Sequence, residues 1–327
     1  SLVGSEMCIR DSLGAGPGGA GAGRGLVNDR MKIFHCDGFP LPLPPGHRFP
    51  IQKYALLREA VMSAGLVPSE SLTVPEPTSD EQILRAHDED YLERVKHGQL
   101  SSKELRRIGL PWSSELVNRA RCSVGGTIGA CRAALREGMA VSLAGGTHHA
   151  FRDHGQGYCV FNDSVIAART MQAEDGVGRA VIVDCDVHQG NGTAAILADD
   201  PTIFTFSIHG AFNFPFHKEP SDLDIGLEDG TGDDAYLEAL RAGLERALEL
   251  AQADLTIYLA GADPYAGDQL GRLLLSKAGL AKRDRLVFEL CRGASLPVAT
   301  VMAGGYGRPI EDTVDIHLQT VRIAAEF

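Results

Sequence analysis

Short apolar runs alternate with amphipathic stretches from residue 31 to the end of the chain. Continuous apolar runs are typical of strands buried on both faces, as in a parallel sheet, and they predict strands at 31–36, 139–144, 180–183, 202–208, 255–259 and 297–302. Helical spacing predicts helices at 52–64, 87–95, 163–172, 233–251, 283–292 and from residue 311, and one or two helices at 112–136 that break around Gly125 and Gly126. This alternation predicts an α/β fold with three layers, α/β/α, around a mostly parallel sheet.

The first thirty residues differ from the rest of the chain. Residues 13–25 consist almost entirely of Gly, Ala, Pro and Arg, and no apolar run of signal-peptide length occurs there. We therefore expect residues 1–30 to be a disordered or non-native leader. No internal repeat or linker interrupts residues 31–327, which we expect to form a single domain.

Net charge and cysteine content limit the kinds of partner and the cellular compartment that we expect for this chain. The net charge of −12 argues against a nucleic-acid partner, because phosphate binding needs concentrated Lys and Arg. The seven cysteines are scattered and form no Cys-x-x-Cys pair, which indicates a reducing, cytoplasmic compartment rather than a disulfide framework. No apolar run reaches the roughly 18 residues that a membrane span requires, so we expect none.

The strand predicted at 180–183 runs directly into Asp184, Asp186 and His188. Side chains alternate along an extended chain, so these three side chains point the same way if the chain stays extended. Open α/β sheets bind ligands at the carboxyl ends of their strands. Two buried carboxylates and an imidazole at such an end need neutralisation, for which a divalent metal is the simplest candidate. A hydrogen-bonded polar cluster that caps the sheet is the alternative.

Other predicted strands also end in reactive side chains. His148 and His149, Asp263, and Tyr306 follow the strands predicted at 139–144, 255–259 and 297–302. In a parallel sheet these ends share one edge. A metal site with three ligands leaves a position open for water or substrate. Paired imidazoles can transfer protons near neutral pH, and a phenol can donate a hydrogen bond to an oxyanion. Together these groups predict metal-assisted hydrolysis of a carbonyl substrate.

Five motifs, in order, resemble the histone deacetylase superfamily, which has the arginase/deacetylase type of α/β fold. They are Gly-Gly-Thr-His-His-Ala at 145–150, Gly-Tyr-Cys-Val-Phe-Asn-Asp at 157–163, Asp-x-Asp-x-His at 184–188, Ala-Gly-Ala-Asp at 260–263 with Asp268 and Gly271, and Gly-Gly-Tyr at 304–306. His-Gln-Gly-Asn-Gly at 188–192, Phe-His-Lys-Glu-Pro-Ser at 216–221 and Lys-Arg-Asp at 282–284 look most like the class IV branch and its bacterial relatives. The resemblance implies a deacetylase-like catalytic domain at 31–327.

The resemblance also implies roles for individual residues. It implies that Asp186, His188 and Asp263 bind one catalytic zinc ion, that His148 and His149 form a catalytic dyad with His149 as general base, and that Tyr306 polarises the substrate carbonyl. It implies that Asp184 orients His148, and Asn191 stands where class I enzymes have a second dyad Asp. A structural potassium ion would be bound by Asp184, Ser207 and Ile208, together with the backbone carbonyls of Asp186 and His188. The walls of a substrate tunnel would be Gly157, Tyr158, Phe214 and Leu270.

The implied activity is zinc-dependent hydrolysis that removes acetyl or longer acyl groups from the ε-amine of lysine or from a related acylated amine. Segment 108–112 lacks the rim Asp with which class I enzymes hold the substrate backbone, so acyl-lysine proteins, peptides and small acylated amines all remain open as substrates. An acetylpolyamine-type amidohydrolase is one alternative. A catalytically silent metal-binding interaction protein is another. The sequence does not indicate an oligomeric state.

Overall fold

The computed structural model describes Asn28 and residues 30–327, so the expected leader at 1–30 falls almost wholly outside the described residues. One parallel sheet runs through this part of the chain, in the strand order β2-β1-β3-β8-β7-β4-β5-β6. The strands are β1 (Lys32–Phe34), β2 (Leu72–Thr73), β3 (Met139–Ser142), β4 (Ala180–Asp184), β5 (Ile203–Gly210), β6 (Leu223–Leu227), β7 (Leu255–Leu259) and β8 (Val298–Val301).

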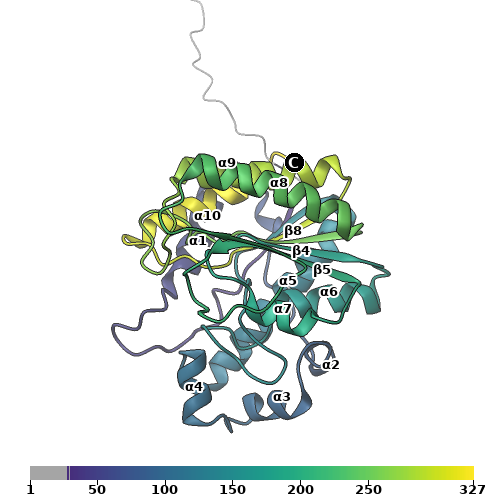
Figure 1. Ribbon diagram of the computed structural model, residues 1–327. Coiled ribbons are helices and arrows are strands. Elements are labelled where there is room, and N and C mark those ends of the chain that lie inside the picture. The colour runs from purple at the N-terminus through teal and green to yellow at the C-terminus, as the bar shows by residue number, and fades with distance from the viewer. Residues whose placement is uncertain (1–27, 29) are drawn as a thin grey trace, which may run out of the picture.

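Helices cover both faces of the sheet (Figure 1). The first face carries α1 (Gln52–Ala64), α8 (Asp233–Ala251), α9 (Lys277–Gly293) and α10 (Ile310–Ala324). The second face carries α5 (Ser114–Glu137), α6 (Asp163–Glu174) and α7 (Asn191–Leu197). Beyond these lie α2 (Asp80–Ile83), α3 (Glu89–Lys96) and α4 (Ser102–Ile108). The predicted three-layer α/β/α fold is confirmed, and none of the described helices is long and apolar enough to cross a membrane.

Strand β4 shows why the sheet needs helices on both faces. All five of its residues are buried. Val181 and Val183 pack into the apolar cluster formed with α8, α9 and α10, whereas Ala180 and Ile182 pack into the cluster formed with α5 and α6. Alternate side chains of a strand point to opposite faces, so a continuous apolar run places apolar groups on both sides.

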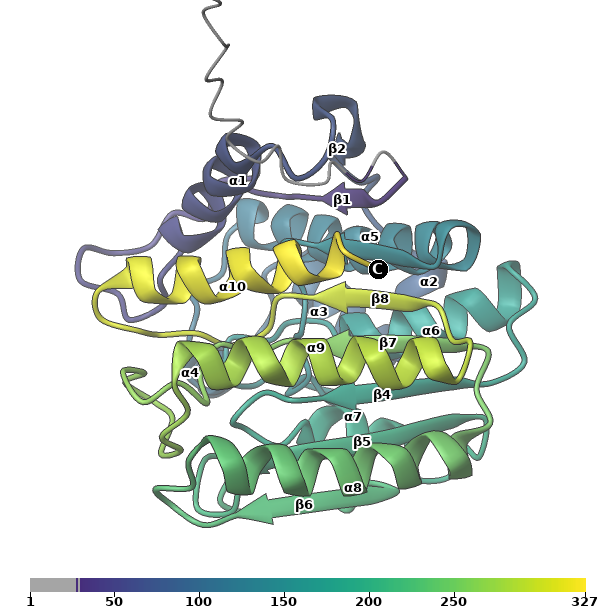
Figure 2. The ribbon, with the colours of Figure 1, turned by 90° about the horizontal axis from the view of Figure 1, so that it is seen from above.

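The register of the strands determines where the functional loops begin. Ser142, Val301, Leu259, Asp184 and Ser207 align side by side across five neighbouring strands. The arrowheads in Figure 2 all point to the same side, because the strands are parallel. The segments that follow β3, β4, β7 and β8 therefore leave the sheet together, at one edge.

Several element boundaries agree with the sequence pattern, and others do not. The helices at 52–64 and 233–251 and the strand at 255–259 are confirmed with the predicted bounds. The predicted break near Gly125 is wrong, because α5 is continuous. A Cβ atom on Gly125 would lie 2.0 Å from the carbonyl oxygen of Glu76, so this glycine allows a close approach of two segments rather than a break. Strand β5 extends past the predicted end to Gly210, because it pairs with β6, which the pattern did not predict.

Candidate metal centre and active-site cavity

Three side chains from the ends of β4 and β7 form a candidate metal centre. Asp186, His188 and Asp263 are buried, and one possible ligand atom from each lies within 4.8 Å of the others. The Nδ1 atom of His188 is 2.9 Å from Oδ1 of Asp186 and 3.3 Å from Oδ2 of Asp263. Two carboxylates and one imidazole are a donor set that zinc accepts, and three protein ligands leave a position for substrate.

The surroundings of this cluster fit a cation. Asp263 Oδ2 is buried and accepts no hydrogen bond from the described residues. Burial and then the charge of Asp186 raise the pKa of Asp263 to about 7. Burial alone would lower the pKa of His188, but its hydrogen bond to Asp186 and the nearby carboxylate of Asp263 raise it to about 10. The cluster therefore favours a positive charge at its centre, which a divalent metal would supply.

The segment after β8 closes over the two carboxylates. The backbone N–H of Gly304 donates to Oδ2 of Asp186 over 2.6 Å, and the N–H of Val187 donates to Oδ1 of Asp263 over 3.0 Å. A Cβ atom on Gly304 would lie 1.8 Å from Oδ2 of Asp263 and 2.5 Å from Oδ2 of Asp186. Only glycine fits there, so the backbone can approach both carboxylates directly.

Lys53 supports this glycine segment from α1. Its Nζ atom donates to the carbonyl oxygens of Ala303, at 3.2 Å, and Gly305, at 3.4 Å, on either side of Gly304. The residue is 3% exposed. Burial lowers the pKa of Lys53 to about 8, although the charges of Asp263, Asp186 and Asp268 oppose this shift. Lys53 is a positioning residue that the sequence analysis missed. Its spacing from Leu57 and Val61, at i, i+4 and i+8, was the available signal, because it puts a lysine on the buried side of an amphipathic helix.

His148 and His149 lie side by side, with ring centroids 4.1 Å apart. His148 donates from Nδ1 to Oδ2 of Asp184 over 2.6 Å, and His149 donates from Nδ1 to Oδ1 of Asn191 over 2.7 Å. These bonds assign the Nδ1 proton of each ring, so in neutral His149 the Nε2 atom is the basic nitrogen.

The two rings differ in electrostatics. Burial would lower the pKa of His148, but the charges of Asp184 and Asp186 outweigh it and raise the pKa to about 9. Burial, followed by the charges of His148 and His188, holds the pKa of His149 well below its ordinary value. His148 is therefore the protonated ring at neutral pH, and His149 is the neutral one. Neighbouring groups with separated pKa values are suited to distinct acid and base roles.

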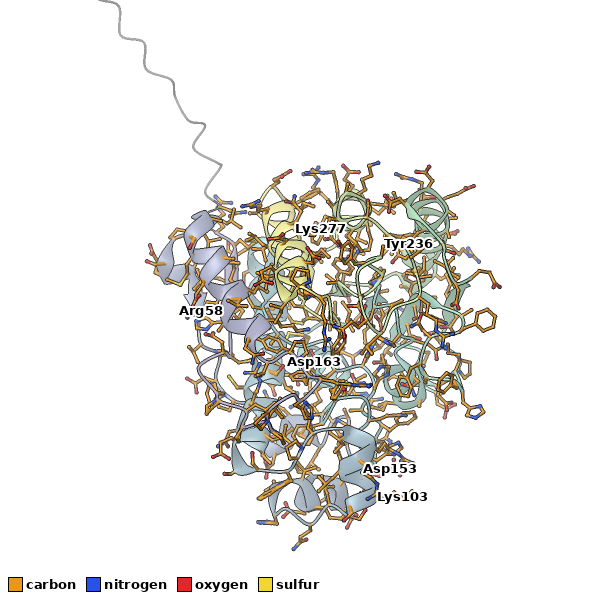
Figure 3. All side chains as sticks on the ribbon, turned by 90° about the vertical axis from the view of Figure 1, so that its left-hand side faces the viewer. Arg58, Lys103, Asp153, Asp163, Tyr236 and Lys277 are labelled. Atoms are coloured by element: carbon orange, nitrogen blue, oxygen red, sulfur yellow. The ribbon has the colours of Figure 1, made fainter. Side chains whose placement is uncertain are left out.

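Asp163 holds the loop that carries the two histidines. This fully buried carboxylate accepts hydrogen bonds from the backbone N–H groups of Gly146, at 3.0 Å, and Thr147, at 2.7 Å, and from the hydroxyl of Thr127, at 2.6 Å. Figure 3 shows Asp163 inside the molecule. The preceding residue, Asn162, caps α6 by accepting the N–H of Val165, which fixes where the helix begins. The Asn-Asp pair of the second motif therefore joins α6 to the histidine loop.

Tyr306 lies at the wall of the same cavity. Its backbone N–H donates to Oδ2 of Asp268 over 2.6 Å, and its ring centroid is 5.9 Å from that of Tyr158. Burial and then the charge of Asp263 raise the pKa of Tyr306 well above its ordinary value. The phenol stays protonated at neutral pH and can donate a hydrogen bond.

The cavity has a volume of about 570 Å³. The candidate metal centre, His148, His149 and Tyr306 line its inner part. The four residues expected as tunnel walls, Gly157, Tyr158, Phe214 and Leu270, line it too. The rings of His149 and Phe214 meet edge to face, with centroids 5.0 Å apart. An apolar chain that enters the cavity would therefore pass aromatic walls and end at the metal cluster.

Asp184 and Ser207, two of the expected potassium ligands, lie side by side on neighbouring strands. Asp184 and Ser207 are paired in register between β4 and β5, and Ile208 is the next residue of β5. The hydroxyl of Ser207 lies 2.9 Å from Nδ1 of His209. All three residues are buried. The register thus brings together the side-chain oxygens that were expected to bind potassium.

The expectation that Asp184, Asp186 and His188 share one extended segment is wrong. Strand β4 ends at Asp184. Asp186 and His188 turn to Asp263, whereas the carboxylate of Asp184 turns to His148. The chain leaves the sheet here because the N–H groups of Asp186 and His188 bond to the carboxylates of Asp184, at 3.1 Å, and Asp186, at 2.9 Å, instead of to a neighbouring strand.

Comparison with known proteins identifies the family. Residues 47–321 match the family described as Histone deacetylase domain. An uncharacterized protein of Picosynechococcus sp. is 44% identical over 294 residues, covering 90% of this chain and 98% of that protein. Histone deacetylase 2 of Arabidopsis thaliana is 30% identical over 286 residues, covering 82% of this chain and 73% of that protein.

A solved structure shares the fold. It is a histone deacetylase homologue from Aquifex aeolicus, which superposes with a TM-score of 0.80 at 22% identity and covers 91% of this chain and 84% of that one. At this identity the superposition supports the architecture alone. The domain match, however, spans most of the sequence and includes every residue of the cavity floor, from His148 to Tyr306. The chain therefore belongs to the histone deacetylase domain family, whose members are deacetylase-type hydrolases.

Proposed function

We propose that this chain is a zinc-dependent hydrolase that removes an acyl group from the ε-amine of lysine or from a related acylated amine. The observation that carries the proposal is the convergence, in one cavity, of the cluster Asp186, His188 and Asp263 with His149 and Tyr306. The aromatic walls of Tyr158 and Phe214 fit an unbranched amine stem, which a lysine side chain provides.

Each group has a proposed task. Asp186, His188 and Asp263 would hold the zinc ion, which when bound supplies Lewis acidity towards a carbonyl and lowers the pKa of water. His149 takes the proton of the attacking water at Nε2, because Asn191 engages its Nδ1–H and its pKa is low. Tyr306 donates its phenol proton in a hydrogen bond to the carbonyl oxygen as negative charge develops there.

The dyad then completes the reaction. Cleavage of the C–N bond leaves an amine that needs a proton, and the protonated form of His149 returns the proton it took from water. His148, which Asp184 keeps charged, disfavours a second imidazolium beside it and so promotes this return. Water thus supplies a hydroxyl group to the acyl product and a hydrogen to the amine.

Finer assignments belong to the same proposal. We place the chain in the class IV branch because Gln189, in the His-Gln-Gly-Asn-Gly motif, bonds both the carbonyl and the N–H of Glu219 in the Phe-His-Lys-Glu-Pro-Ser stretch. A structural potassium ion at Asp184, Ser207 and Ile208 is supported by their register and burial. A cytoplasmic location is supported by free, buried thiols at all six described cysteines.

The experiment that tests the activity is release of a fluorophore from an acetyl-lysine or trifluoroacetyl-lysine substrate. We expect hydrolysis by the zinc-loaded protein and loss with a chelator. Tyr306→Phe removes one hydrogen bond to the developing oxyanion and should lower kcat about 10²- to 10³-fold. His149→Ala should lower kcat about 10²- to 10⁴-fold. Equal rates for the wild type and both variants would remove the proposed mechanism.

A further inference from the structure

The mouth of the cavity carries arginines, whereas the carboxylates that line the cavity lie at its floor. Asp186 and Asp263 are the only carboxylates among the described residues that line the cavity, and both belong to the metal cluster at the floor. Arg106, Arg107 and Arg272 line the outer part and are exposed. The whole chain has a net charge of −12, so a mouth that is lined, among the described residues, by three arginines and no carboxylate runs against the average of the molecule.

Two of these arginines have no partner within the described part of the chain. Neither the side chain of Arg106 nor that of Arg107 makes an ion pair or hydrogen bond there, whereas Arg94, on the neighbouring helix, pairs with Asp90 at 2.9 Å and also with Glu104. Arg272 lies 3.4 Å from Asp229, in a pair whose side chains are about half exposed. Arg106 and Arg107 therefore keep their full charge available at the mouth.

The helix that carries both residues is fixed to the cavity wall. The N–H of Gly157 donates to the carbonyl of Arg107 over 3.1 Å, and the N–H of Tyr158 donates to the carbonyl of Ile108 over 2.7 Å. A capping box between Ser101 and Glu104 fixes the start of α4. The two guanidinium groups thus stand beside the entry of the tunnel rather than on a loosely attached loop.

We propose that Arg106 and Arg107 make this enzyme select acylated amines that carry a negative charge close to the acylated side chain. This inference rests on the proposed deacylase function. Two sources can present such an anion: Asp or Glu next to an acyl-lysine in a protein, or the carboxylate of a small molecule such as free Nε-acyl-lysine. A polyamine, which is cationic, is the poorest match for this mouth.

A structural explanation for the arginines exists and can be separated experimentally. Both lie in the last turn of α4, where a cation is favoured by the helix dipole. Arg136 occupies the same position in α5, is exposed, and does not line the cavity. Arg136→Gln is therefore a matched control, because it removes a similar cation from a helix end away from the mouth.

The test compares kcat/KM for peptides that contain one trifluoroacetyl-lysine flanked by Glu, Gln or Lys, and for Nε-acetyl-lysine with a free or an amidated carboxyl group. We expect wild type and Arg136→Gln to prefer Glu over Lys flanks by about tenfold at low salt. The preference should fall to about twofold in the variant with Arg106→Gln and Arg107→Gln, and reverse when both become Glu. It should also shrink at 1 M salt, where the screening length is only about 3 Å.

The outcomes separate this inference from the proposed function. Hydrolysis of all peptides at equal rates, or a preference that survives removal of both arginines, overturns the inference and leaves the deacylase function intact. A preference that is seen only for Nε-acetyl-lysine with a free carboxylate supports the inference and identifies a small molecule as the source of the anion. If neither the peptides nor Nε-acetyl-lysine is hydrolysed, the proposed function fails. Binding of dye-labelled peptides to Tyr306→Phe, measured by fluorescence anisotropy, then decides the inference, because equal binding of Glu-flanked and Lys-flanked peptides contradicts it.

Discussion

The floor and the mouth of the cavity are built in different ways. At the floor, Asp186, His188, Asp263, His148 and His149 are buried, follow strands of one sheet, and are connected by hydrogen bonds and ion pairs of 2.6 to 3.3 Å. At the mouth, Arg106 and Arg107 of α4 and Phe216 come from outside the sheet, and their side chains are exposed. The comparison indicates that strand register fixes the chemistry, whereas exposed residues on attached segments can change substrate choice without disturbing it.

The largest effect is expected from the floor itself. Asp263→Ala removes one of the three proposed ligands and leaves His188 with a single carboxylate partner. Loss of a residue that only orients a ligand costs about 10- to 100-fold in metal affinity or activity. Loss of a ligand should therefore lower kcat/KM and zinc affinity by more than about 10³-fold. Zinc content and peptide hydrolysis check this, with Asp199→Ala, at an exposed residue that does not line the cavity, as control. Full zinc occupancy in Asp263→Ala would disprove the assignment.

Replacement of Lys53, which holds the glycine segment at the cavity floor, should have the next largest effect. Lys53→Met keeps the length of the side chain but leaves the carbonyls of Ala303 and Gly305 without their donor. We expect kcat to fall about 10- to 100-fold, because Gly304 and Tyr306 lose their fixed position, and KM to change less.

The matched control for Lys53→Met is Arg58→Met, on the same helix (Figure 3), where the guanidinium bonds Asp37 at 2.7 Å and Sδ of Met62 at 3.1 Å and does not line the cavity. The control should keep wild-type kcat and lose at most about 1 kcal/mol of stability. Equal kcat in both variants and the wild type would show that Lys53 does not position the active site.

The protonation state of His149, at the cavity floor, can be altered without removing its side chain. Asn191→Asp puts a carboxylate against Nδ1 of His149, which stabilises the imidazolium and raises its pKa from the low value that burial and His148 impose. The base is then protonated over a wider range, so the acid side of the pH profile of kcat/KM should move to higher pH. The loss should be greater at pH 6 than at pH 8. An unshifted acid limb would mean that His149 is not the base.

The smallest effect is expected at the mouth. Phe216 is 79% exposed, lines the cavity entrance and meets Phe214 edge to face at 6.5 Å. Phe216→Ala should raise KM about two- to fivefold with kcat unchanged, because an exposed ring loses little when truncated. Steady-state kinetics with a peptide substrate measure this. A fall in kcat of more than about tenfold would show that the mouth and the floor are not independent.

The same division explains what the sequence could predict. The apolar runs of β4 and β7 determine where Asp186, His188 and Asp263 leave the sheet, so a reading of strand ends brings them together before any coordinates. The spacing of Lys53 from Leu57 and Val61 indicates burial, but not its role, because its partners are backbone carbonyls some 250 positions away. Strand β6 was missed because its burial alternates between half-buried and exposed, without the apolar run that marks the central strands.

The hydrophobic pattern of the sequence also could not predict that Arg106 and Arg107 lie at the cavity mouth. Arg106 and Arg107 follow Glu104 in a short amphipathic helix, and such a run usually covers a solvated surface. Their position beside the tunnel depends on two backbone hydrogen bonds to Gly157 and Tyr158, which are tertiary contacts. The expected break at Gly125 failed for a similar reason, because that glycine meets a distant carbonyl instead of ending its helix.

The most direct test of the central claim is a zinc titration of metal-free protein, followed by hydrolysis of an acetyl-lysine or trifluoroacetyl-lysine peptide. If the ends of β4 and β7 hold a single catalytic ion, activity should be absent without zinc and rise linearly to a plateau at one equivalent. Asp263→Ala should show no plateau of activity at one equivalent of zinc. Hydrolysis by the metal-free wild type, or a plateau that Asp263→Ala reaches at the same equivalence, would contradict the account.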